Sequence, residues 1–153
     1  MNNSLTSIDD SINNSRWILL FGVWLIYFAF GLVMASMAPL VMPIMKDLDL
    51  NSTRMGSILG AWPLVYILLA IPCGSFIDRV GLKWSLLIAA LMMGISAYLR
   101  SISFDFLSLF IAVGIFGLGG PLISIGAPKL ISQYFVGRER GFAMGIYITG
   151  PGL

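Results

Sequence analysis

The chain has 153 residues, of which 58% are hydrophobic and 10% are charged, and its formal net charge is +2. Soluble domains carry about 25% charged residues, and a chain of this length could not hide so much apolar surface in one core. The composition therefore predicts an integral membrane protein, and the small net charge, with no basic face, excludes nucleic acid as a partner.

The first segment, residues 1–16, is polar and precedes the first apolar run. Residues 1–15 are rich in Asn, Ser and Asp, a composition that predicts a disordered tail. The apolar run that follows is not a cleaved signal peptide, because it exceeds the roughly 7–15 residues of a signal core and only Arg16 precedes it as a base.

Charge-free runs fill most of the remaining sequence, residues 17–153. About 20 apolar residues cross a bilayer as a helix, and continuous apolar runs indicate helices rather than the alternating strands of a barrel. An all-α fold is therefore predicted, with four complete transmembrane helices and a fifth that is cut off. The expected spans are about 17–45, 55–77, 84–100, 105–130 and 141–153. Because the last run is too short to cross, we expect the chain to be a fragment.

The ends of these spans carry further expectations. The first run is long, so we expect it to tilt or to kink near Pro39 and Pro43. The third run is short, so Lys83 and Arg100 are expected to snorkel outward to the membrane surface. Lys129, about one turn before the end of the fourth helix, is likewise interpreted as snorkelling, with attraction of anions as the alternative.

Small residues repeat along several spans. Gly56 and Gly60 in the second run, and Gly141 and Gly145 in the fifth, have the four-residue spacing that lets helix backbones approach closely in lipid. The fourth run has a dense group of glycines that ends at Pro121, a pattern that predicts a kink.

The nine lysines and arginines predict the orientation. Loops on the cytoplasmic side carry an excess of these residues. An N-terminus inside the cell gives six bases on the cytoplasmic side and three outside. The inner set is Arg16, Arg79, Lys83, Lys129, Arg138 and Arg140, and the outer set is Lys46, Arg54 and Arg100.

Between the second and third runs lies the segment CGSFIDRVGLKW, residues 73–84, which holds Gly74, Asp78, Arg79, Gly81 and Lys83 within a few positions. The pattern of Gly, three residues, Asp-Arg, one residue and Gly resembles the signature loop of the major facilitator superfamily. In that family a basic pair follows the second glycine, whereas here only the second member, Lys83, is basic. The position also fits, because the loop joins the second and third helices on the expected cytoplasmic side.

A second segment, FVGRERGFAMGIYITGPG at residues 135–152, is similar to the link between the fourth and fifth helices of many facilitators. Gly150-Pro151 looks like the glycine–proline motif of some subfamilies, although the spacing from Gly145 is one residue longer. Drug/proton antiporters of the superfamily carry an arginine before the glycine-rich part of the fourth helix. The corresponding place here, near Val113, is uncharged, which argues against that subfamily.

The resemblance implies a twelve-helix bundle of two halves, with the substrate bound at the midplane between them. Residues 17–153 would be part of the N-terminal six-helix domain, and its partners would be the lipid bilayer, a small-molecule solute and the C-terminal half of the same protein. The signature loop would act as a conformational switch that latches the halves together. Asp78 is expected to face the N-terminus of the third helix, near Lys83 to Ser85.

The predicted function is a secondary active or facilitative transporter that moves a small solute by alternating access, in the plasma or inner membrane. The Arg-Glu-Arg-Gly turn is reminiscent of organic or inorganic anion facilitators. The alternative is a non-transporting sensor or scaffold subunit built on the same helices.

Enzymatic activity is not expected. The sequence has no histidine, its single cysteine is Cys73, and no nucleophile, metal cluster or acid pair is recognisable. We therefore assign no catalytic residue, metal site or cofactor. No acid lies inside a span, so proton coupling would use residues beyond this segment. The polar-tipped residues deep enough to line a substrate cavity are Tyr27, Tyr66, Ser124 and Tyr147.

Overall fold

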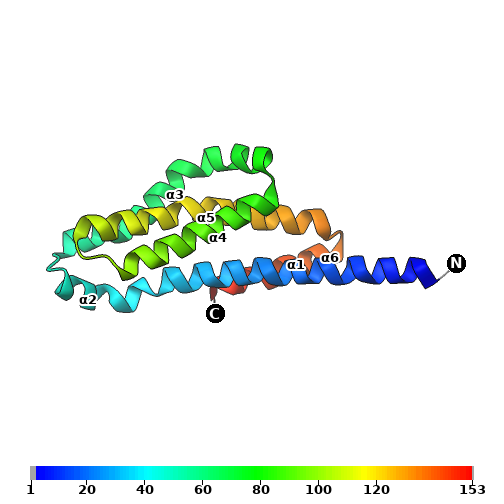
Figure 1. Cartoon of the computed structure of the whole chain (residues 1–153), viewed down its shortest axis with the longest axis horizontal. Helices are drawn as coiled ribbons and strands as arrows, with labels where there is room; N and C mark the ends of the chain where they lie inside the picture. The colour runs from blue at the N-terminus through cyan, green and yellow to red at the C-terminus, as the bar shows by residue number, and fades with distance from the viewer. Residues whose placement is uncertain (1–2, 153) are drawn as a thin grey trace.

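The computed structural model describes the backbone of residues 3–152 and the side chains of residues 16–152. The described elements are helices, with no strand among them (Figure 1). Their bounds are α1 Asn3–Ala35, α2 Met37–Asp47, α3 Ser52–Val80, α4 Leu82–Ser101, α5 Phe106–Tyr134 and α6 Arg138–Ile148, followed by the 3-10 turn η1 Gly150–Gly152.

Among the described residues, four stretches are long and apolar enough to cross a membrane, which confirms the predicted fold class. They are Arg16–Asp47, Ser52–Val80, Leu82–Ser101 and Phe106–Tyr134, and each extends slightly beyond the charge-free run that predicted it. The fifth run is the short helix α6 and the turn η1, which lie alongside α1 (Figure 1).

The first span is broken, as its prolines predicted. α1 ends at Ala35 and α2 begins at Met37, with Ser36 between them. Pro39 has no backbone N–H, so the carbonyl of Ala35 lacks its usual helical donor four residues ahead. In the same turn, the Ser36 hydroxyl donates to the carbonyl of Val33, 2.8 Å away. This bond gives the broken end of α1 a polar partner in an apolar setting.

The prediction of a disordered tail is wrong from Asn3 onward, where the backbone is already helical and continuous with the first span. Extending an existing helix costs far less than starting one, so a polar segment attached to a long helix can continue it. The first two residues of that predicted tail lie outside the described part of the chain.

Helix α5 forms the centre of the bundle and packs against both α3 and α4. Its glycines make this possible. A β-carbon at Gly119 would lie 3.1 Å from the carbonyl oxygen of Ala89 on α4, and one at Gly117 would lie 2.5 Å from the carbonyl oxygen of Trp62 on α3. The buried Ser96 hydroxyl adds a hydrogen bond across α4 and α5, 2.6 Å from the carbonyl of Ala112. The glycine-rich stretch that predicted a kink runs through an unbroken helix, and its role here is close packing.

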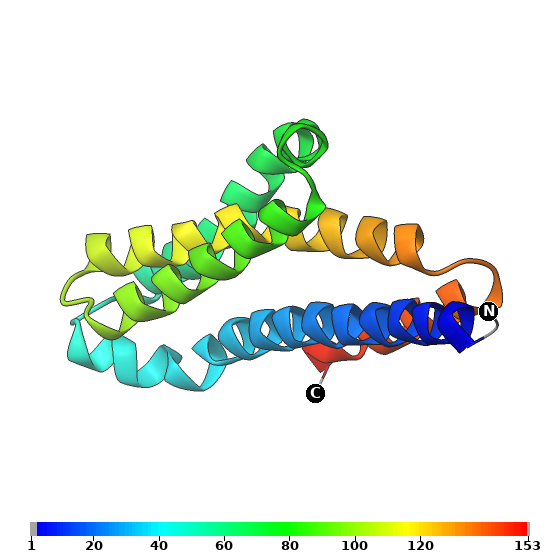
Figure 2. The ribbon, with the colours of Figure 1, turned by 45° about the vertical axis from the view of Figure 1, so that its right-hand side comes forward.

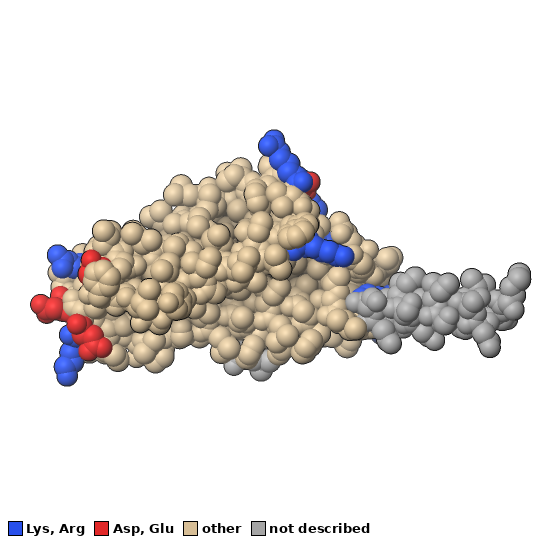
Figure 3. Space-filling model, viewed as in Figure 1, with Lys and Arg blue, Asp and Glu red and all other residues tan. Residues whose placement is uncertain are grey.

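Helix α3 changes direction in its last turns, which Figure 2 shows nearly end-on. Pro72 lies inside α3 and removes one helical hydrogen bond, which accounts for a bend of this kind. Charged side chains gather at the two ends of the bundle and leave a broad uncharged band between them (Figure 3). Large apolar side chains are exposed along this band, among them Ile67, Ile71 and Leu87. Such a surface suits lipid rather than water.

Candidate functional site

The turn between α3 and α4 consists of one residue, Gly81. Its φ of 90° and ψ of 152° lie in a region that L side chains rarely adopt, so glycine is required there. Its N–H donates to the carbonyl of Ile77, 2.9 Å away, and its carbonyl accepts the hydroxyl of Ser85, also 2.9 Å away. Gly81 is therefore both the C-cap of α3 and the N-cap of α4, with no further loop residue between the helices.

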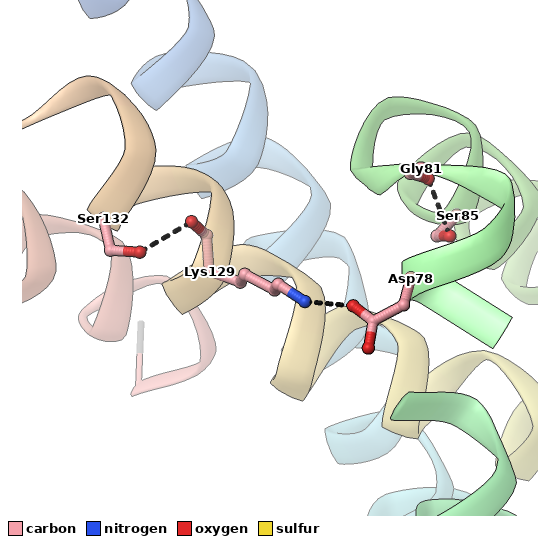
Figure 4. Close-up of polar contacts among 5 residues, drawn as sticks. All are labelled: Asp78, Gly81, Ser85, Lys129 and Ser132. Carbon is pink, nitrogen blue, oxygen red and sulfur yellow. Dashed lines mark hydrogen bonds and ion pairs between the residues drawn. The ribbon is translucent and has the colours of Figure 1, made fainter. Parts of the chain in front are cut away.

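Asp78 lies in the last turn of α3 and forms an ion pair with Lys129 of α5, whose Nζ donates to Oδ1 of the carboxylate (Figure 4). The two side chains are 62% and 43% exposed, so water screens the pair, and exposed pairs of this kind contribute about 0–1 kcal/mol. The pair joins two helices that lie side by side in the core of the bundle.

This pair corrects the expectation for Asp78, which was expected to face the N-terminus of the third helix. The expectation that Lys129 snorkels is not contradicted, because its side chain is 43% exposed. The two side chains meet because α3 and α5 run in the same direction and both residues lie near the C-terminal ends of their spans. That equivalent depth is the sequence signal that would have suggested the pair. The hydroxyl of Ser85, in the first turn of α4, bonds back to Gly81 rather than to the carboxylate.

A groove of about 490 Å³ lies beside the pair. It is lined by residues of α3, α4 and α5, including Asp78, Lys83 and Lys129. Arg79 and Lys83 are exposed, and neither forms an ion pair among the described side chains. A β-carbon at Gly74 would meet no atom within 4 Å. Of the five residues expected in the switch loop, the structure therefore gives Asp78 and Gly81 defined contacts.

A second ion pair, at the start of the first span, involves the Arg-Glu-Arg-Gly turn. Nη1 of Arg16 lies 3.1 Å from Oε2 of Glu139 in the first turn of α6. The guanidinium of Arg16 also lies 5.6 Å from the centre of the buried Phe135 ring. These contacts fix the turn between α5 and α6 to the first span.

The four cavity candidates meet as two pairs. The hydroxyl of Tyr66 lies 2.8 Å from that of Ser124, and the rings of Tyr27 and Tyr147 meet edge to face at 5.1 Å. Tyr147 is buried, so it packs inside the described helices rather than lining an open surface.

Three aromatic residues outside the set of cavity candidates connect these pairs. Phe30 stacks on Phe116 at 4.9 Å, and Trp62 meets Phe116 edge to face at 6.1 Å. Tyr27 and Tyr66 extend the row at its two ends, 6.3 Å from Phe30 and from Trp62 respectively. A continuous aromatic row therefore crosses the bundle from α1 to α3. Only the spatial neighbours of these rings distinguish them from ordinary core residues.

The glycine repeats divide into two groups. A β-carbon at Gly150 would lie 3.0 Å from the backbone nitrogen of Phe28, and one at Gly31 would lie 2.5 Å from Cα of Pro151, so η1 packs tightly on α1. The other four repeat glycines meet no atom within 4 Å of such a β-carbon: Gly56, Gly60, Gly141 and Gly145. Close packing at these four positions is not found within the described chain and stays a prediction for surfaces outside it.

Arg100 contradicts the expectation that it snorkels outward. Its guanidinium lies 5.1 Å from the centre of the Phe116 ring, and Nη1 donates to the carbonyl of Val33 at 3.4 Å. Nε is buried and has no hydrogen-bond partner. The bend at Ser36 leaves room and a carbonyl for the guanidinium inside the bundle, which sequence spacing alone does not reveal. No group of residues that would hold a metal ion is found in the described part of the chain.

Comparison with known proteins identifies a family and several relatives. The sequence profile of the Major Facilitator Superfamily matches residues 19–153. The hexuronate transporter of Bacillus subtilis (strain 168) is 28% identical over 110 residues, which cover 72% of this chain and 26% of that protein. The quinolone resistance protein NorA of Staphylococcus aureus (strain N315) is 23% identical over 150 residues, which cover 93% of this chain and 38% of that protein. The chain thus spans about a quarter to two fifths of the length of these relatives.

Proposed function

The chain belongs to the major facilitator superfamily, and on that premise we propose that it supplies the N-terminal helices of a secondary transporter, active or facilitative, that moves a small solute by alternating access. It is an integral, multi-pass membrane protein, and its family points to transport rather than to enzymatic catalysis. The proposal concerns the protein at its natural full length.

The observation that carries the proposal is the Asp78–Lys129 ion pair beside the one-residue turn at Gly81. The turn holds α3 and α4 at a fixed separation, so the loop behaves as one rigid corner of the bundle. The ion pair beside that corner, between α3 and α5, is partly hydrated and therefore weak. A weak, well-placed carboxylate can exchange partners when the second half of a transporter closes on this face, as a latch between two states requires.

The solute that we propose is a small organic anion. One relative is named a hexuronate transporter, and hexuronates are sugars that carry a carboxylate. Another is named a quinolone resistance protein, but the region of α5 near Val113 lacks the arginine that the resemblance implies for drug antiporters. The cavities beside Arg100 have the size of small-molecule sites, at about 360 and 510 Å³.

We further propose that the N-terminus lies in the cytoplasm and that the protein resides in the plasma or inner membrane. Six of the nine bases then fall on the cytoplasmic side. The signature loop and the Arg16–Glu139 pair lie on that same side in this orientation, so both would take part in closing the cytoplasmic face.

The test is Asp78→Asn in the natural full-length protein, reconstituted in liposomes and assayed for uptake of radiolabelled glucuronate. A shift of about 1 kcal/mol between two balanced states changes their ratio roughly fivefold, so uptake should fall severalfold while folded yield stays unchanged. A cysteine in the cavity should also become more accessible from the cytoplasmic side.

The matched control is Asp49→Asn. Asp49 is an exposed acid in the loop between α2 and α3, and its φ of 49° is one that asparagine adopts readily. This variant should transport like the wild type. If Asp78→Asn takes up solute at the wild-type rate and the accessibility of the cavity cysteine is unchanged, the loop is only a turn and has no latch role. Correct insertion of the wild type without uptake of any solute would favour the sensor or scaffold alternative.

A further inference from the structure

Arg100 sits in an unusual position for a charge, inside the bundle and against an aromatic ring. It occupies the last turn of α4, yet its side chain turns toward α1 and α5 instead of toward the membrane surface. Phe116, over which it lies, is only 1% exposed. A guanidinium stays protonated in proteins, so a full positive charge lies in this largely apolar region.

The protein offers this charge little compensation. The ion pairs of the described side chains are Arg16–Glu139 and Asp78–Lys129, so no described carboxylate lies within 4.0 Å of Arg100. Among the described residues its partners are one carbonyl at 3.4 Å and the face of one ring. The Nε–H donor is buried and unpaired. A buried charged donor without a partner is unfavourable, and a bound anion would remove that penalty.

Two cavities meet at Arg100. One, of about 360 Å³, lies beside the break in the first span and is lined by Val33, Ser36 and Arg100 among others. The other, of about 510 Å³, is lined by Arg100 and by apolar side chains that include Met34, Trp62 and Phe116. Methionine and aromatic walls suit the body of a small organic molecule, and a guanidinium suits its acid group.

We propose that Arg100 is the group that binds the carboxylate of the transported solute, whose apolar or sugar body occupies the cavity between Met34, Trp62 and Phe116. The inference rests on the proposed transport function and adds to it a binding residue and a substrate class. The guanidinium offers a planar pair of donors, which matches the two oxygens of a carboxylate better than any lysine does. The guanidinium lies over the ring of Phe116, and the Val33 carbonyl bonds only Nη1, which leaves the other two nitrogens for a ligand.

A purely structural role for Arg100 makes different predictions. The carbonyl of Val33 lies near the C-terminal end of α1, where a positive charge is favourable. Asp47 also lines the smaller cavity, but it is exposed and forms no ion pair with Arg100. If Arg100 only capped α1, any cation or donor at this position would serve, and carboxylates would have no effect on the protein.

The test is thermal unfolding of the purified natural full-length protein in detergent. Sodium acetate, glucuronate and benzoate are each compared with sodium chloride at equal ionic strength. Glucuronamide, the uncharged amide of glucuronate, serves as the neutral control. At least one carboxylate should raise the midpoint in a saturable way, because a ligand of the folded state stabilises it. Glucuronamide should not.

Two substitutions locate the effect. Arg100→Gln keeps a donor for Val33 but removes the charge, and should weaken apparent carboxylate affinity at least tenfold. Arg100→Lys keeps the charge but loses the fork, and should weaken it severalfold. Arg54→Gln is the matched control, because Arg54 also lies over a ring, that of Phe106 at 5.8 Å, but lines neither cavity. It should bind carboxylates as the wild type does.

A second measurement leaves Arg100 unchanged and covers the case in which its variants fail to fold. In a background with Cys73→Ala, a cysteine at Met34 should be protected from a thiol reagent by the stabilising carboxylate but not by glucuronamide. The inference is overturned if no carboxylate stabilises or protects the protein, or if the Arg100 variants respond as the wild type does. Arg100-dependent binding without uptake in liposomes would instead leave this site standing and refute transport.

Discussion

Gly117 offers the most direct test of how α3 and α5 pack. In Gly117→Ala the new β-carbon would lie 2.5 Å from the carbonyl oxygen of Trp62 and 2.9 Å from Cβ of Val65. The Trp62 oxygen belongs to the backbone, and Cβ of Val65 is bonded directly to it. Neither atom can therefore move aside unless α3 itself shifts. Helices α3 and α5 must therefore move apart by several tenths of an ångström where Gly117 packs against Trp62. Overpacking of this kind costs about 1–3 kcal/mol.

Gly114, one turn earlier on α5, is the matched control. Its added β-carbon would lie 3.9 Å from Cγ2 of Val65, an ordinary contact, so Gly114→Ala should be neutral or slightly stabilising. The assay is thermal unfolding in detergent, with the inactivation half-life at a fixed temperature as a second readout. For a unit of 150–250 residues, about 2–4 °C is lost per kcal/mol, so Gly117→Ala should unfold several degrees earlier. Equal midpoints for the two variants would refute the close approach of these backbones.

Two further predictions concern the loops. Asp105 caps α5, and hydrogen bonds from the Ser108 hydroxyl and backbone N–H hold the pKa of its carboxyl below the ordinary value of 3.8. Because the pKa is lower in the folded state, the stabilisation is present above the unfolded-state pKa and is lost as the pH falls through the folded-state pKa. Between about pH 5 and pH 3 the unfolding midpoint of the wild type should therefore drop more than that of Asp105→Asn, which caps the helix without titrating. Coincident pH profiles of the two proteins would contradict this. Single cysteines at Ser4, Ser52, Ser103 and Val136 in a Cys73→Ala background should react with an impermeant thiol reagent in intact cells at 52 and 103 only. The opposite pattern would reverse the orientation.

The spans were predictable because the physics of a bilayer is local. A charge inside lipid is unfavourable whatever its neighbours are, so gaps between charges mark helices directly. Pro39 likewise acts on its own backbone, and the break at Ser36 follows from it. The loop between the second and third helices was also predictable, because glycines and charged residues interrupt the apolar runs there. That the turn is a single residue, Gly81, became apparent only in the structure.

The contacts of the site were less accessible, because they join residues far apart in the sequence. Asp78 and Lys129 meet only because α3 and α5 are neighbours, and spacing along one helix carries no such information. Arg100 lies at the end of a short span, where snorkelling is the default. A bend in a different helix turns it inward. Glycine repeats show the same limit, since Gly141 and Gly145 have the expected spacing but the closest packing falls at Gly31 and Gly117.

The central place of α5 has a consequence for biosynthesis. Its glycines and small residues bring it against both α3 and α4, whereas α3 and α4 share far less contact with each other despite the single residue that connects them. Chains emerge from the ribosome N-terminus first, so α3 and α4 enter the membrane before the helix that holds them together. Until α5 arrives, the grooves that receive Gly117 and Gly119 are open to lipid. Assembly of this bundle therefore waits for its fourth span, and an interruption of synthesis before Phe106 would leave a helical pair with little to keep it paired.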